Sequence, residues 1–135
     1  MKKIIAIDVG NSETTVGVGN SNEWTGYRFT TRKTITSDEL LMMFKTIIDI
    51  EPIKENKVDG AIICSVVPQI TNSVALATSK FISKEAIVVG PGIKTGLKVN
   101  IDNPKELGPD RIANSIGGYM KVESPVIVVD LGTAT

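Results

Sequence analysis

The sequence predicts an α/β domain with a mixed five-stranded sheet and helices on the faces of that sheet. Three observations predict this fold class. Short runs rich in β-branched residues come first, and amphipathic helical patterns then alternate with further strand-like runs. Residues 60–67 form one continuous apolar run, which is typical of a strand buried on both faces. A strand followed by Asp-x-Gly occurs near each end of the chain.

The first three expected strands form an antiparallel meander. Lys3–Val9 is a short apolar run that ends in a turn, and Thr14–Gly19 is β-branched and glycine-rich. Asn20–Asn22 is a turn pattern, and Trp24–Thr30 alternates as a strand does. Successive strands joined by such short turns pair antiparallel.

Two helices and two further strands are expected next. Thr36 and Glu39 form the pattern of a capping box, which predicts the start of a helix that Pro52 ends. The apolar positions of this helix recur at helical spacing and should face the core: Leu40, Phe44, Ile47 and Ile48. The expected elements after it are the strand 60–67, a helix over Thr71–Ser83 and a strand over Ala86–Val89.

The remaining elements suggest how the domain ends. Pro104–Arg111 is turn-like, and a helix is expected to continue from it to about Lys121. The apolar run Val126–Val129 predicts one more strand. This order of elements matches a ribonuclease-H-like α/β domain over residues 1–122, and residues 123–135 would begin a second, similar domain with its first strand.

The composition excludes several classes of protein. Of the 135 residues, 41% are hydrophobic and 22% are charged, so the chain should bury a core rather than stay disordered. Fifteen basic residues balance fifteen acidic ones, which gives no reason to expect nucleic acid or an anionic membrane as a partner. No apolar run is long enough to span a bilayer, and the first residues lack the pattern of a signal peptide. A single cysteine, Cys64, fits a reducing, cytoplasmic location.

The absence of histidine limits the chemistry. With no imidazole and one cysteine, the sequence excludes the usual zinc clusters and the Ser-His or Cys-His nucleophile pairs. Acid–base work in this chain therefore falls to carboxylates, lysines, tyrosines or water.

The repeated Asp-x-Gly turn is the strongest functional signal. Residues 5–12 and 127–134 each consist of an apolar strand, an aspartate, an apolar residue, a glycine and small residues. One such turn is ordinary turn chemistry, whereas two copies followed by hydroxyl-bearing residues favour a function. The aspartates, Asp8 and Asp130, would lie where their strands end, and each glycine lets the backbone approach a ligand.

The first turn is expected to bind phosphate and a metal ion. The N–H groups of residues 10–12 can form a nest for an anion, and the hydroxyls of Ser12, Thr14 and Thr15 add donors. Asp8 would hold Mg²⁺ through water, because Mg²⁺ keeps much of its hydration shell and a carboxylate beside a phosphate needs a cation between them. The sequence has neither the Gly-x-x-x-x-Gly-Lys-Ser/Thr loop of a P-loop protein nor the Gly-x-Gly-x-x-Gly turn of a Rossmann protein.

The segment Gly108-Pro109-Asp110 permits two interpretations. Proline and an acid at this point are typical of a helix N-terminus, where the acid favours the positive end of the helix. Asp110 can also serve as a base that orients a hydroxyl and accepts its proton late in phosphoryl transfer. The planar guanidinium of Arg111 suits a carboxylate ligand, and an ordinary exposed arginine is the alternative.

Paired Asp-x-Gly turns on duplicated ribonuclease-H-like domains resemble the superfamily of actin, sugar kinases and chaperone ATPases. Within that superfamily, three segments together resemble the type III pantothenate kinases: Asp8–Ser12, Asn103–Asn114 and Asp130–Thr135. The middle segment is the most specific of the three, because the wider superfamily does not share it. The resemblance covers the whole chain, with the segments in order.

The resemblance implies ATP-dependent phosphorylation of pantothenate to 4′-phosphopantothenate, the first step of coenzyme A biosynthesis. It implies ATP binding by both turns, through Asp8, Val9, Gly10, Asn11, Ser12, Glu13, Thr14, Thr15 and Thr133. It implies pantothenate binding by Gly108, Pro109, Asp110 and Arg111, with Asp110 as the base. Asp130 would help bind a monovalent cation, K⁺ or NH₄⁺, and family members are homodimers with pantothenate bound near the interface.

Several features depart from the family pattern. Ile101 stands where an aromatic residue is common, which affects one substrate contact, and Pro109 replaces a small residue. Ser12 stands where threonine is usual and keeps the hydroxyl. The family continues into a full second domain, so these residues are expected to be a fragment, a truncated form or part of a split gene product, without activity alone.

Two other functions stay open. One is a non-catalytic relative of the same family that works as an accessory factor in gene regulation. The other is an actin-like or chaperone-type ATPase, which should lack the segment Gly108–Arg111. Neutral net charge and the intact acidic positions favour the kinase over the first alternative.

Overall fold

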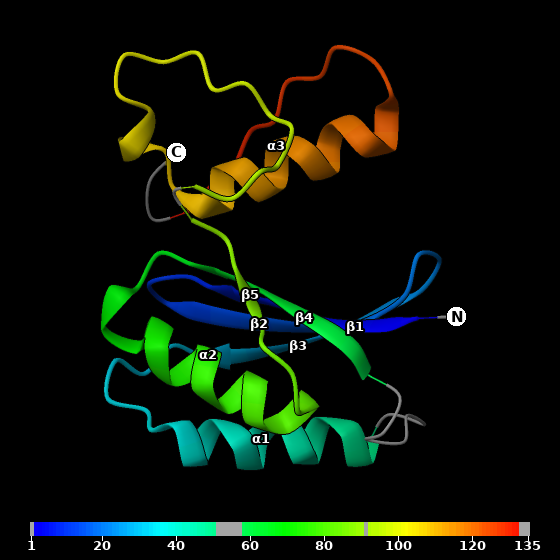
Figure 1. Cartoon of the computed structure of the whole chain (residues 1–135), viewed down its shortest axis with the longest axis vertical. Helices are drawn as coiled ribbons and strands as arrows, with labels where there is room; N and C mark the ends of the chain where they lie inside the picture. Colours follow the sequence, from blue (N-terminus) through cyan, green and yellow to red (C-terminus); the bar gives the residue numbers. More distant parts are fainter. Residues whose placement is uncertain (1, 51–57, 91, 133–135) are drawn as a thin grey trace.

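A computed structural model describes residues 2–50, 58–90 and 92–132 and has one mixed sheet between two helical layers (Figure 1). The sheet has five strands in the order β3-β2-β1-β4-β5. Helices α1 and α2 lie on one side of it, and α3 lies on the other (Figure 1). This architecture confirms the predicted α/β class and the mixed five-stranded sheet.

The strands combine a meander with two parallel pairs. β1 (Lys3–Val9), β2 (Glu13–Gly19) and β3 (Trp24–Thr30) pair antiparallel in sequence, as predicted. β1 also pairs in parallel with β4 (Val58–Ser65), and β4 pairs in parallel with the short β5 (Ile87–Val88). Because parallel neighbours need a long crossover, α1 connects the meander to β4 and α2 connects β4 to β5.

The two crossover helices begin at recognisable signals. α1 (Ser37–Ile50) has the predicted capping box: Glu39 N–H donates to Thr36 Oγ1 at 3.3 Å, and Thr36 N–H donates to Glu39 Oε2 at 2.8 Å. Its predicted stop at Pro52 lies outside the described residues. α2 (Pro68–Ile82) begins earlier than predicted, because proline is well suited to the first turn of a helix.

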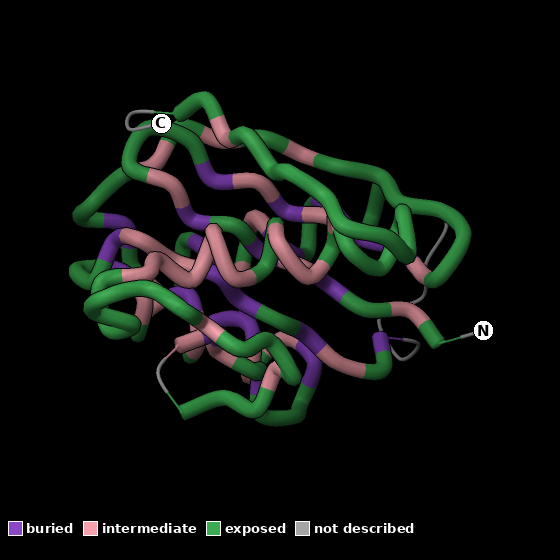
Figure 2. The backbone as a smooth tube through the Cα atoms, turned by 90° about the horizontal axis from the view of Figure 1, so that it is seen from above, coloured by how far each residue is buried: buried purple, intermediate pink, exposed green. Residues whose placement is uncertain are grey.

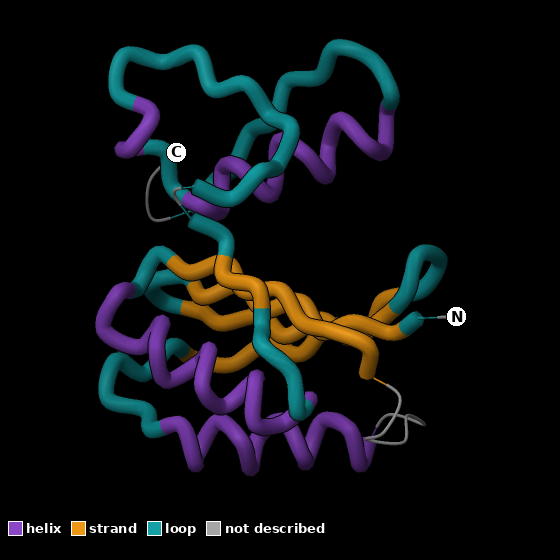
Figure 3. Tube along the Cα trace, in the orientation of Figure 1, coloured by secondary structure: helices purple, strands orange, loops and turns teal. Residues whose placement is uncertain are grey.

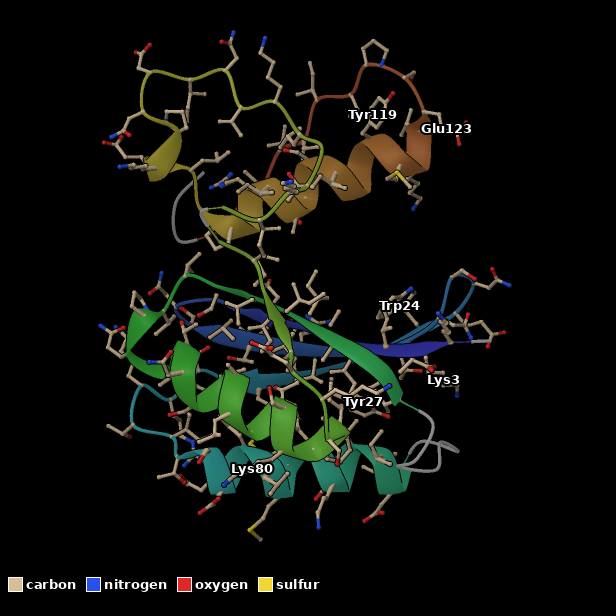
Figure 4. The ribbon with its side chains drawn as sticks, viewed as in Figure 1. Lys3, Trp24, Tyr27, Lys80, Tyr119 and Glu123 are labelled. Atoms are coloured by element: carbon tan, nitrogen blue, oxygen red, sulfur yellow. The ribbon has the colours of Figure 1, made fainter. Side chains whose placement is uncertain are left out.

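The hydrophobic core fills the space between the sheet and the helices α1 and α2. Alternate residues of β1 point into it, and the predicted stripe of α1 is buried there. Figure 2 colours the backbone by burial. Its members include Ile5, Ile7, Val9, Val16, Val18, Leu40, Phe44, Ile47, Ile48, Ile63 and Val74. Figure 4 shows the same division of faces on β3, with Trp24 on the α3 side and Tyr27 on the other.

The α3 side of the sheet is covered more loosely. A short 3-10 turn, η2 (Pro104–Glu106), precedes α3 (Pro109–Val122), and no residue of α3 is buried. The chain reverses at Glu123, which adopts a positive φ of 54° and caps α3. The following residues run back beside α3, from its C-terminal end toward its N-terminal end (Figures 1 and 3).

The predicted strand at Val126–Val129 is not formed. The structure assigns no strand there among its described residues, and Figure 3 draws the segment as loop. A strand needs a neighbouring backbone to bond, and this run has none in the sheet, so its apolar side chains are exposed, Ile127 by 91%. The boundary at residue 122 coincides with the end of α3, and the second domain stays a prediction.

The helices in the described ranges are all too short or too polar to cross a membrane.

Candidate functional site

The first Asp-x-Gly turn follows β1 at the edge where the parallel strands β1 and β4 both end. Gly10 N–H donates to the carbonyl of Glu13 at 2.9 Å and closes the turn. A Cβ at position 10 would lie 2.9 Å from that same oxygen, so the turn requires glycine. The prediction that the Gly10 N–H faces a phosphate is therefore wrong, because the turn itself uses that donor.

Thr31 fixes the turn from the neighbouring strand. Its hydroxyl donates to the carbonyl of Gly10 at 2.7 Å, and its N–H donates to the carbonyl of Ser12 at 2.9 Å. The hydroxyl of Thr14 donates to Thr31 Oγ1 at 2.8 Å, since the single Thr31 hydrogen is already used. Within the described part of the chain, no bond occupies the exposed N–H groups of Asn11 and Ser12, so these two donors can meet an anion.

The pleat of the sheet separates the predicted ATP-binding residues. Val9 and Thr14 point to the face under α1 and α2, where they are 0% and 8% exposed. Asp8 and Thr15 alternate with them and therefore point to the α3 side. The side chains of Val9 and Thr14 are thus not brought to the site, whereas the Asp8 carboxylate and the Thr15 hydroxyl are.

A cleft of about 710 Å³ gathers most of the remaining predicted residues. It lies between the first turn, the N-terminal part of α3 and the returning segment, residues 124–132. Figure 1 shows α3 and this segment together on one side of the sheet. Its lining consists of Asp8, Gly10, Asn11, Ser12, Glu13, Thr15, Val66, Asp110, Arg111, Asn114, Asp130 and Gly132. Residues from four separate stretches of sequence therefore meet at one opening.

Asp110 lies in the first turn of α3, and its carboxylate folds back over Gly108. Asp110 Oδ1 accepts the Arg111 N–H at 2.8 Å, and a Cβ at position 108 would collide with that same oxygen. Glycine at 108 is thus needed for the carboxylate to take this position. Of the four predicted pantothenate-binding residues, Asp110 and Arg111 line the cleft, whereas Gly108 and Pro109 shape the start of the helix.

The second Asp-x-Gly turn reaches the cleft through the returning segment. Asn114 Nδ2 donates to Asp130 Oδ2 at 3.1 Å, and Gly132 also lines the cleft. Thr133, the predicted nucleotide contact, lies outside the described residues. The sequence analysis named Asn114 only as the end of a family segment, without a role, and it did not name Thr31. Asn114 follows Asp110 by four residues on a predicted helix, and this spacing could have indicated that both side chains face the same site.

The cleft concentrates negative charge. Burial raises the pKa of Asp8, and the neighbouring carboxylates of Asp110 and Asp130 raise it further. Burial, followed by the charges of Asp8 and Asp110, raises the pKa of the Cys64 thiol to about 12. The described residues hold no group of three or more His, Cys, Asp or Glu placed to coordinate a metal directly. A cation bound here would therefore have to keep water ligands.

A second, smaller cavity of about 270 Å³ adjoins the cleft between α3 and the sheet. The two cavities share Asp8, Thr15, Asp110 and Asn114. The other walls of the smaller cavity are mainly apolar or small, from Ala6, Ile7, Gly17, Ile62, Cys64, Val89 and Ala113. Asp110 thus stands between a polar opening and an apolar recess.

The sheet order and the cleft at the ends of β1 and β4 define a ribonuclease-H-like domain of the actin-like ATPase class. A solved structure of YeaZ from Pseudomonas aeruginosa shares the fold, with a TM-score of 0.52 and 12% identity over 66% of this chain and 44% of that one. The sequence model of a family described as type III pantothenate kinase matches residues 4–135. The chain belongs to the type III pantothenate kinase family.

Curated relatives agree with this assignment. The chain is 41% identical over 133 residues to a type III pantothenate kinase of Bifidobacterium longum subsp. infantis, which covers 98% of this chain and 52% of the relative. It is 38% identical over the same length to a type III pantothenate kinase of an Exiguobacterium species, again covering 52% of that protein. The chain therefore spans about half the length of the curated relatives it matches.

Proposed function

We propose that the complete protein transfers the γ-phosphoryl group of ATP to the primary hydroxyl of pantothenate. The observation that carries this proposal is that the first turn, Asp110 and Asp130 line one cleft. Membership of the family supports the choice of pantothenate as acceptor. Phosphoryl transfer asks mainly for positioning and charge stabilisation, which such a cleft can supply.

The nucleotide phosphates would bind at the first turn. The N–H groups of Asn11 and Ser12 and the hydroxyls of Ser12 and Thr15 are donors on the cleft side of that turn. Thr31 holds this backbone in place without reaching the ligand. The predicted contact of Thr133 would add a hydroxyl from the second turn.

The acidic cleft fits a divalent cation. Burial raises the pKa of Asp8, and the carboxylates of Asp110 and Asp130 raise it further, so added positive charge would be favourable here. Oxygen ligands are those that Mg²⁺ prefers, and Mg²⁺ bound to proteins usually keeps several of its waters. When bound, Mg²⁺ would neutralise charge on the phosphates, and Asp8 would hold it through water.

The acceptor would bind across the boundary between the two cavities. The primary hydroxyl of pantothenate adjoins a carbon that carries two methyl groups, and the apolar recess beside Asp110 suits that branched carbon. The guanidinium of Arg111 suits the pantothenate carboxylate. Asp110 Oδ1 already accepts the Arg111 N–H, which leaves Oδ2 to accept the hydroxyl proton.

Asp130 would bind the monovalent cation. Its Oδ2 accepts from Asn114, and none of the described residues bonds its Oδ1, which leaves that oxygen for K⁺ or NH₄⁺. The homodimer and the cytoplasmic location stay predictions from the family resemblance and from the composition.

A coupled ATP-turnover assay on the complete gene product tests the proposal. ADP release should require pantothenate, Mg²⁺ and a monovalent cation, and 4′-phosphopantothenate should form in equal amount. Turnover without pantothenate would favour the actin-like or chaperone-type ATPase. No turnover under any of these conditions would favour the accessory factor.

A further inference from the structure

We propose that Asn114 is a positioning residue that holds the Asp130 carboxylate against α3 and so sets the second Asp-x-Gly turn opposite the first. The role rests on the proposed function for its kinetic consequence. Its structural basis is an exposed hydrogen bond from Asn114 Nδ2 to Asp130 Oδ2 at 3.1 Å, with Asp130 itself half-buried.

The location of Asn114 suits this role. It follows Asp110 by one turn of α3, so both side chains lie on the same face of the helix. Both residues line the polar cleft and the apolar recess. Asn114 therefore links the acid proposed as base to the acid proposed as cation ligand, which lies on a different segment.

The returning segment needs such a bond to fix its register. Residues 124–132 form no strand, so no ladder of backbone bonds sets their position along α3. Close packing occurs at Gly118, where a Cβ would lie 3.0 Å from Val128 Cγ2. Apolar packing of this kind tolerates sliding, whereas the bond from Asn114 selects one alignment. That alignment brings Asp130 and Gly132 to the cleft.

A neutral donor is the appropriate group at this position. Asp8 and Asp110 line the same cleft and already place negative charge there. A lysine or arginine could also hold Asp130, but its charge would compete with a bound cation. An amide donates one hydrogen bond and leaves the charge of Asp130 for a ligand.

The kinetic test is the variant Asn114→Ala in the complete gene product. Loss of a hydrogen bond to a charged group should lower kcat/KM for ATP by about tenfold or more. The unfolding midpoint should change by less than about 2 °C, because the bond holds only residues 124–132, which form no part of the sheet and can detach without global unfolding. Unchanged kcat/KM, or a loss explained by a large fall in the unfolding midpoint, would overturn the proposal.

A double-mutant cycle with Asp130→Asn separates positioning from a direct role. On the Asp130→Asn background, Asn114→Ala should change kcat/KM by less than about twofold, since its partner is gone. Fully additive losses would contradict the proposal. Asn114→Gln keeps the donor and should recover part of the activity, whereas the isosteric Asn114→Asp should not. Ser115→Ala, at the next position of α3, is the matched control and should leave kcat/KM unchanged.

A structural measurement on the 135-residue chain stands apart from activity. NMR should show nuclear Overhauser effects between the Asn114 side-chain amide and the Asp130 β-protons, and Asn114→Ala should make the Asp130 backbone more mobile. Absence of these contacts would refute the positioning role even in an active kinase. If the contacts are present but the complete protein does not phosphorylate pantothenate, the proposed function fails and the placement of Asp130 stands.

Discussion

The face of the sheet under α1 and α2 and the face under α3 share the same strands but differ in packing. On β4, Ile63 points to the first face and is 0% exposed, whereas its neighbour Ile62 points to the second and is 37% exposed. The first face is a continuous apolar core, and the second holds a cleft, a recess and three carboxylates. One face thus supplies the stability of the domain, and the other supplies room for ligands.

The unfavourable electrostatic interactions of the domain lie on the α3 face of the sheet. Burial raises the pKa of Asp8 and the charges of Asp110 and Asp130 raise it further, while the described buried side chains leave no polar atom without a partner. Under the proposed function this charge stays unfavourable until a cation binds. The packed face compensates for it, so substitutions on the two faces should have separable effects on activity and stability.

The largest expected effect is on activity, from Asp110→Asn on the open face. Removal of a general base should lower kcat by about 10²- to 10⁴-fold, because the amide cannot accept the proton of the hydroxyl. The unfolding midpoint should remain close to that of the parent, since Asp110 is only partly buried. The coupled ATP-turnover assay measures the first effect and thermal unfolding the second. Asp102→Asn, an exposed acid outside the cleft, should keep full activity.

A matched pair on β4 tests the packed face directly. Ile63→Ala should lower the free energy of unfolding by about 2–5 kcal/mol, because it leaves a cavity in a closed core. Ile62→Ala should cost less than about 1 kcal/mol, because its side chain is already partly in water. Urea titrations of the chain measure both values. Equal losses in the free energy of unfolding would show that the two faces are packed alike, which would contradict the difference drawn between them.

Two glycines of the α3 region give the next contrast. Gly108→Ala should lower kcat by about 10- to 100-fold, because the new Cβ collides with Asp110 Oδ1 and displaces the carboxylate. Gly117→Ala, where a Cβ meets nothing within 4 Å, should stabilise α3 by up to about 1 kcal/mol without loss of activity. Steady-state kinetics with unfolding curves distinguish the two. Equal activity of both variants would mean that Gly108 does not position Asp110.

The elements that could be predicted from the sequence were those with local signals. The capping box of Thr36 and Glu39 and the apolar stripe of α1 depend on neighbours in sequence, and both are confirmed. The repeated turn likewise identified Asp8 and Asp130 as residues of one cleft. The burial of Thr14 could also have been predicted, because it lies two residues from the buried Val16 on the same strand and therefore on the same face of the sheet.

The remaining features depend on contacts between distant segments. The run at Val126–Val129 has the composition of a strand, but a strand forms only where another backbone bonds to it. The bond from Gly10 N–H to Glu13 and the contacts of Thr31 arise from the geometry of the hairpin. The pairing of Asn114 with Asp130 requires the chain reversal at Glu123. No spacing of residues in the sequence predicts these contacts.

The smallest expected effect is a change in the pH dependence of stability, from Asp8→Asn. The pKa of Asp8 is raised above its ordinary value of 3.8 by burial and by the charges of Asp110 and Asp130. A raised folded-state pKa means that the folded chain binds the proton more tightly than the unfolded chain does. The resulting stabilisation is fully present below pH 3.8 and is lost as the pH rises through the folded-state pKa.

Near pH 7 the ligand-free Asp8→Asn chain should therefore unfold at a higher temperature than the parent, although its activity is lost. Unfolding midpoints from pH 3 to pH 8 give the difference between the two curves, which should widen as the pH rises. Parallel curves would show that the carboxylates do not crowd one another, and the open face would then carry no strain.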